Sequence, residues 1–273
     1  MFLCKVKSLG YDSIKQYLSG IKYHYICANY GDILSGKPRL DLTLQGIMKS
    51  RRHAARAIKR EPITANLLAG MCRLLLAGIF GEFIDKLMAA VLTTGFFAAL
   101  RCGEFTIDRA ASFDSKRHLC LGDVVFTKQD NKDMVKINLK SSKTDVRGKG
   151  VELFVFATGG PICPYKHLMD YVRVRNRLTC DPNSHLFIMP SRDPLTRAVY
   201  LNHLRLLLRG VGVNDKMFSG HSLRKGMATE SCKKQIPDSV INVLGRWHSD
   251  VYKLYIHTPK SIIADAHSKL ASV

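Results

Sequence analysis

Strand-like patterns occupy one short part of this 273-residue chain, and this restriction limits the folds open to it. Three central segments rich in Val, Ile and Phe alternate apolar and polar residues with the period of two that is typical of β-strands: His118–Lys128, Asp133–Ser142 and Gly150–Thr158. The sequences between them, KQDNKD and KTDVRGKG, are rich in turn formers. The pattern therefore predicts one small antiparallel, three-stranded sheet.

The segments on both sides of this sheet have helical periodicity. Near the N-terminus, apolar residues lie close to an i, i+3, i+4, i+7 pattern: Ile14, Tyr17, Leu18, Ile21 and Tyr25. The longest apolar run, from Leu87 to Leu100, is too short to cross a membrane and is expected to form a buried helix. We therefore predict a mainly α protein with a small inserted sheet, in the α+β class.

A break at Pro62, in the sequence REPIT, predicts a boundary between two domains. Residues 1–61 would form a small helical domain that ends in a basic linker, and residues 62–273 would contain the sheet and most of the helices. With 46% hydrophobic residues, the chain has enough apolar side chains for a packed core.

The charge of the chain favours a polyanionic partner, because 42 Lys and Arg against 22 Asp and Glu give a net charge of +20. Double-stranded DNA is the expected partner, although a merely basic, ribosome-like protein would have a similar charge. The candidate DNA-binding residues form a run before Pro62: Lys49, Arg51, Arg52, Arg56, Lys59 and Arg60. A solvated helix face or a nuclear-import signal would explain the same run.

Eight scattered cysteines and no secretory signal predict reduced thiols in an intracellular protein, and the basic run favours the nucleus. We expect no membrane segment.

Two cationic motifs suggest an anion site. In SGHSLRKGMATE, His221 and Arg224 share one face of a predicted helix, where two cationic groups repel each other unless an anion lies between them. In TGFFAALRCGEF, Arg101 follows a wholly apolar helix and needs a partner, since an unpaired buried charge is costly. An internal salt bridge with Glu104 or Asp108 would also satisfy Arg101.

Two further motifs add a lysine and aromatic residues. LKSSKTDVRGKG places Lys143 at a strand end beside a turn, where an ordinary exposed lysine would also fit. LGRWHSDVYKLYIH contains Trp247, His248, Tyr252 and Tyr255, and the tyrosines would equally suit a helix packed on the core.

Phosphodiester transfer is the chemistry that uses all of these groups. Two arginines hold the non-bridging oxygens of a phosphate, and an imidazole carries a proton. A lysine protonates the leaving 5′-oxygen, and a tyrosine hydroxyl attacks phosphorus to give a covalent intermediate. The cationic side chains supply the electrostatic stabilisation, so we expect neither a metal nor another cofactor.

The order of the motifs ALRCGE, SKTD, GHSLRKG and LGRWHSD…YIH resembles that of the tyrosine recombinase (phage integrase) family. The resemblance covers the chain from about Pro62 onward. PIT and LGRW.SD.Y..YI are most similar to eukaryotic mobile-element recombinases of the crypton and DIRS type. The resemblance implies the family's catalytic fold, preceded in the chain by a helical core-binding domain. It also implies an enzyme of DNA recombination and integration that assembles as dimers or tetramers on DNA.

Residue by residue, the resemblance implies these roles: Arg101 and Arg224 as phosphate clamps, Lys143 as general acid, His221 as general base or phosphate ligand, Trp247 or His248 in the family's variable His/Trp position, Tyr255 as nucleophile and Glu104 as a brace for Arg101. Two features depart from the pattern. The family has its His/Trp residue nine positions before the tyrosine, where this chain has Arg246, and its core-binding domain has four or five helices, of which two or three are expected here.

Three other functions compete with this hypothesis. A domesticated, non-catalytic DNA-binding protein could retain the same fold. A type IB topoisomerase uses similar chemistry, but the chain lacks long clamp insertions. A zinc enzyme has little support, because the motif CPYKH (Cys163–His167) has no paired partner motif.

Overall fold

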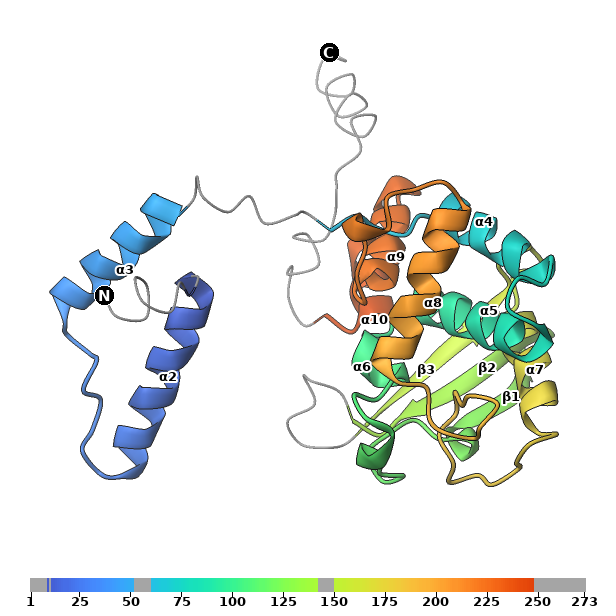
Figure 1. The fold of residues 1–273 in the computed structure, drawn as a ribbon, viewed down its shortest axis with the longest axis horizontal. Helices are drawn as coiled ribbons and strands as arrows, with labels where there is room; N and C mark the ends of the chain where they lie inside the picture. The colour runs from blue at the N-terminus through green and yellow to red at the C-terminus, as the bar shows by residue number, and fades with distance from the viewer. Residues whose placement is uncertain (1–8, 10, 52–59, 142–149, 248–273) are drawn as a thin grey trace, which may run out of the picture. The chain divides into compact units, whose positions relative to one another are not determined.

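The computed structural model describes residue 9 and residues 11–51, 60–141 and 150–247. The chain divides into two compact units, Met1–Lys59 and Arg60–Val273. In the first unit, helices α2 (Tyr11–Cys27) and α3 (Pro38–Arg51) contact each other (Figure 1). Ile14 is buried, but other apolar residues of the α2 pattern are not, since Tyr17 is 56% exposed.

The second unit is mainly helical around one small sheet, so the predicted fold class is confirmed. Over residues 60–141 and 150–247 its α-helices are α4 (Ala65–Leu76), α5 (Glu82–Phe97), α6 (Cys102–Phe105), α7 (Pro164–Arg175), α8 (Arg197–Gly210), α9 (Ser222–Lys233) and α10 (Asp238–Gly245). None of the helices that the structure describes is both long enough and apolar enough to cross a membrane.

The sheet is an antiparallel meander in the order β1 (Val124–Gln129), β2 (Lys132–Leu139), β3 (Val151–Phe156). Val135 pairs with Phe126 on one side and with Val155 on the other. The turn from β1 to β2 places Asp130 and Asn131 at φ of 48° and 63°, the left-handed conformation that two-residue hairpins favour. The strands begin and end within a few residues of the predicted segments, except that β1 starts six residues later.

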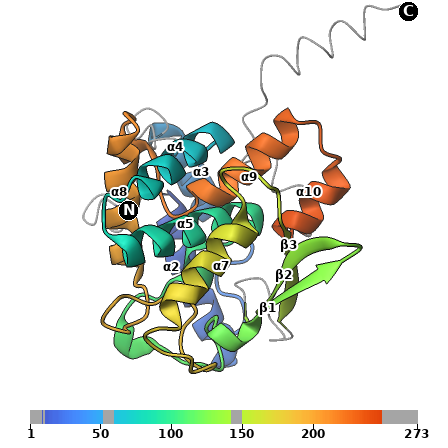
Figure 2. The same ribbon diagram turned by 90° about the vertical axis from the view of Figure 1, so that its right-hand side faces the viewer.

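Helix α5 forms the centre of the core. Its residues from Leu87 to Phe96 are buried, as the apolar run predicted, and it contacts α4, α7 and α9 (Figure 2). Helix α7 in turn contacts β2 and β3, so the inward strand residues Val135 and Val155 join the same core cluster. The helical region before the sheet is interrupted twice, between α4 and α5 and between α5 and α6.

Candidate functional site

Arg101 lies at the N-cap of α6, immediately after the buried helix α5. The Glu104 carboxylate, 5% exposed, accepts hydrogen bonds from both the backbone N–H and the Nη1 of Arg101, at 2.8 and 2.9 Å. The backbone bond is the one that a glutamate makes in a helix capping box. Arg101 therefore forms the internal salt bridge that the sequence left open, with Glu104 rather than Asp108, and it stays 19% exposed.

The loop before α9 packs against the start of α6. A Cβ at Gly220 would lie 2.8 Å from Cys102 Cβ, so this close approach requires a glycine. His221 follows as the N-cap of α9, and its side chain is exposed. This packing brings the segment that contains His221 next to the segment that contains Arg101.

Arg224, one turn into α9, is almost completely buried at 4% exposure. Its Nη1 donates to the carbonyl of Ala99 and its Nη2 donates to the carbonyl of Gly245. Ala99 has φ of 47°, a left-handed conformation that costs a non-glycine residue about 1 kcal/mol. This turn directs the Ala99 carbonyl to Arg224, so the ends of α5 and α10 both contact the same guanidinium.

Trp247 lies against this guanidinium. The Arg224 Cζ is 4.4 Å from the centre of the indole ring, within the range of a cation–π contact. The indole also leaves no room at Gly245, where an added Cβ would be 1.7 Å from the ring. The motif LGRW therefore packs an aromatic ring against both a glycine and Arg224.

Arg246 also belongs to this cluster, although the sequence analysis gave it no role. It ends α10 with φ of 53°, and its side chain is 10% exposed. Its Nη2 donates to the Ala99 carbonyl at 3.1 Å and to Glu104 Oε2 at 2.9 Å. Its position nine residues before Tyr255 was the one sequence signal that could have identified it.

Arg101, Arg224 and Arg246 are thus connected through two shared acceptors, the Glu104 carboxylate and the Ala99 carbonyl. Among the residues that the structure describes, the Glu104 carboxylate pairs with two guanidinium groups, those of Arg101 and Arg246, so one negative charge faces two positive charges at a mostly buried place. Such an excess favours binding of an anion, because uncompensated buried charge is costly.

Several predicted residues lie outside the residues that the structure describes: Lys143, His248, Tyr252, Tyr255, Arg52, Arg56 and Lys59. In the basic run, Lys49 is exposed on α3 and Arg51 is the last residue of that helix. Arg60 is exposed, and its Nη1 donates to the carbonyl of Lys216. The structure leaves the DNA-binding role of this run as a prediction.

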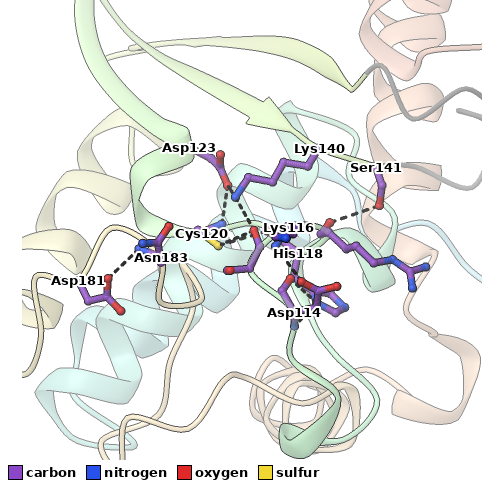
Figure 3. Close-up of polar contacts among 11 residues, drawn as sticks. Asp114, Lys116, His118, Cys120, Asp123, Lys140, Ser141, Asp181 and Asn183 are labelled. Atoms are coloured by element: carbon purple, nitrogen blue, oxygen red, sulfur yellow. Dashed lines mark hydrogen bonds and ion pairs between the residues drawn. The ribbon is translucent and has the colours of Figure 1, made fainter.

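Lys140 follows the end of β2, three residues before Lys143, and its ammonium group is held by an ion pair and a hydrogen bond. Its Nζ lies 2.7 Å from Asp123 Oδ2 and donates to the Ser115 carbonyl at 2.8 Å (Figure 3). Burial opposes the charged form of Lys140, but hydrogen bonds to Asp123 and Cys120 outweigh it and raise the lysine pKa. Lys140 is therefore a paired structural cation and a poor proton donor.

Two tyrosines in the described part of the second unit are poor nucleophiles. Tyr171 and Tyr200 are fully buried, and burial raises the pKa of both phenols. The structure thus offers no substitute for the predicted Tyr255 at these two buried positions.

The zinc alternative gains nothing from the structure. In CPYKH, His167 Nε2 lies 2.8 Å from the Pro161 carbonyl, and Cys163 Sγ accepts from the Thr158 N–H. Within residues 9, 11–51, 60–141 and 150–247, no group of three His, Cys, Asp or Glu side chains is arranged to hold a metal ion.

Comparison with known proteins finds similarity in structure alone. No family model and no curated protein sequence matches the chain. The Tn1549 transposon integrase in complex with transposon right end DNA superposes with a TM-score of 0.60 at 15% identity, over 98% of this chain and 82% of that one. The XerA recombinase superposes with a TM-score of 0.53 at 15% identity, over 100% of this chain and 80% of that one.

The XerH site-specific recombinase bound to palindromic difH substrate gives a TM-score of 0.56 at 18% identity. The match covers 76% of this chain and 52% of XerH, so the chain spans about half the length of that protein. These identities are too low to transfer an activity, but the agreement in structure is clear. The protein has the fold of the tyrosine recombinases and integrases.

Proposed function

We propose that this protein breaks and rejoins double-stranded DNA as a tyrosine recombinase. The observation that supports this most is the buried cluster that links Arg101 and Arg224, 123 positions apart in the chain, through Arg246. Arg246 shares the Glu104 carboxylate with Arg101 and the Ala99 carbonyl with Arg224, next to the segment that contains His221. Guanidinium groups suit phosphate oxygens, and preorganised cations stabilise the charge of a pentacoordinate transition state without a metal or ATP.

The proposed reaction forms one bond to phosphorus, breaks another and transfers two protons. The Tyr255 oxygen attacks phosphorus while the phenol proton passes to His221, and the bond from phosphorus to the 5′-oxygen breaks. Lys143 gives a proton to that oxygen, which leaves a 3′-phosphotyrosine and a free 5′-hydroxyl. Attack by a 5′-hydroxyl on the phosphotyrosine reverses these steps and rejoins the strand.

The other proposed roles follow from the cluster and the resemblance. Glu104 braces Arg101, and Trp247 holds Arg224 by stacking on it, while Trp247 or His248 fills the family's variable position. The run from Lys49 to Arg60 binds the DNA backbone and would serve in nuclear import. We further propose integration of a mobile element of the crypton or DIRS type, by dimers or tetramers assembled on DNA.

A covalent adduct is the direct test. The protein is incubated with a pool of nicked duplexes of random sequence, in which the short strand beyond the cleaved bond diffuses away and traps the intermediate. We expect an SDS-resistant complex of protein and DNA that Tyr255→Phe abolishes while DNA binding persists. Tyr252→Phe is the matched control and should retain the adduct.

Reversed behaviour of the two variants would make Tyr252 the nucleophile. If no adduct forms with the wild-type protein, the non-catalytic DNA-binding function replaces this proposal.

A further inference from the structure

We propose that Arg246 is a third phosphate-binding guanidinium, which also couples the side chains of Arg101 and Arg224. This inference rests on the proposed function for its biological meaning. The anion site itself follows from the arrangement of Arg246 and has a test of its own.

The first step is the state of the Arg246 donors. Only Nη2 is used, toward the Ala99 carbonyl and Glu104 Oε2. Nε and Nη1 are buried and have no hydrogen-bond partner among the residues that the structure describes. Buried donors of this kind are rare, because each loses its water without a replacement.

The second step is the chemistry of the missing acceptor. The Glu104 carboxylate already accepts from both Arg101 and Arg246, so its one negative charge does not neutralise both guanidinium groups. An acceptor with negative charge on several oxygens would satisfy the open donors and the excess charge together. A phosphate diester has two such oxygens. The hydrogen bonds that arginine donates to a phosphate are stronger than those that it donates to a neutral acceptor.

The third step is the position of Arg246 between the two proposed clamps. It shares the Ala99 carbonyl with Arg224 and the Glu104 carboxylate with Arg101. A phosphate held by Arg101 and Arg224 would therefore lie beside Arg246. The left-handed backbone of Arg246 turns the chain at the end of α10, next to the buried Gly245.

Inorganic phosphate is the first probe, because it needs no knowledge of the DNA target. Its dissociation constant is measured from the rise in unfolding temperature with phosphate concentration, for the full-length wild type and for Arg246→Met. We expect the variant to bind phosphate at least about tenfold more weakly, since it loses hydrogen bonds to a charged group. Arg192→Met removes one exposed arginine as a matched control and should bind as the wild type does.

Because Arg246→Met could unfold by releasing Glu104, Arg246→Lys provides a second variant. Lysine keeps one charge but lacks the arginine fork, so we expect weaker phosphate binding than in the wild type. Unchanged phosphate affinity in a folded Arg246→Met or Arg246→Lys would overturn the proposal and reduce Arg246 to a brace for Glu104.

The second probe is cleavage of duplexes recovered in the adduct assay, with either a normal phosphate or a neutral methylphosphonate at the cleaved position. Arg246→Met should slow adduct formation about 100-fold on the normal phosphate, the loss typical of one oxyanion donor, and much less on the methylphosphonate. Equal losses on both substrates would contradict contact with the phosphate. Phosphate binding that depends on Arg246 without any adduct in the wild type would retain this site and reject the recombinase function.

Discussion

Replacement of Glu104 by glutamine tests the electrostatics of the cluster directly. Glutamine keeps the shape of the side chain and one carbonyl acceptor, but it removes the single negative charge between Arg101 and Arg246. The Glu104 side chain is 5% exposed and its two partners are 19% and 10% exposed, so solvent screens them little. Loss of one partner of a buried ion pair costs about 3–5 kcal/mol, and the partial exposure of Arg101 favours the lower end.

The expected change is therefore a loss of about 3 kcal/mol in the free energy of unfolding. For a unit of this size that corresponds to a fall of roughly 6–12 °C in the unfolding temperature. Urea and thermal denaturation, followed by circular dichroism, would measure both quantities.

Glu82→Gln is the matched control, because Glu82 is 60% exposed and forms an i,i+4 pair with Lys86 on the surface of α5. Exposed pairs contribute about 0.5 kcal/mol or less, so this variant should unfold close to the wild type. A loss below 1 kcal/mol in Glu104→Gln would refute the reasoning, since it would mean that Arg101 and Arg246 do not depend on the Glu104 charge.

Three other predictions concern packing, protonation and DNA. Gly245→Ala should displace the indole of Trp247, the only tryptophan, and shift its fluorescence emission, whereas Gly103→Ala, with nothing within 4 Å of an added Cβ, should not. Burial lowers the pKa of His185 from 6.5 to about 4, so the unfolded state binds the extra proton first. Stability should then fall as the pH falls from 6.5 to about 4, by up to roughly 3 kcal/mol, and the folded variant His185→Gln should flatten this part of a urea denaturation series. DNA affinity, measured by fluorescence anisotropy, should fall with salt with a slope of about 0.9 in log K for each phosphate neutralised, and an affinity independent of salt would contradict binding through the basic residues.

The fold was largely predictable because its signals are local. The change from helical period to strand period located the sheet, and the pair Asp130–Asn131 marked its first turn. The break between α5 and α6 was not predictable, because Ala98, Ala99 and Leu100 are all compatible with a helix. The left-handed Ala99 is fixed by distant partners, since its carbonyl accepts from Arg224 and Arg246.

The residue types of the candidate cluster were predictable from the sequence, but the contacts between them were not. Arg101, Arg224 and Glu104 were identified from their motifs, and the structure joins them. Arg246 was missed because its contacts reach 142 and 147 positions back along the chain, and no local pattern reports them. The sequence analysis instead assigned the family's His/Trp position to the neighbouring Trp247 or His248.

The segment that enters the second unit is attached to the site by its backbone. Glu61 donates its N–H to the Met217 carbonyl, and Ile63 donates to the carbonyl of Ser222, in the first turn of α9. Tension on the preceding chain would therefore be carried first to Met217 and next to the helix that contains Arg224.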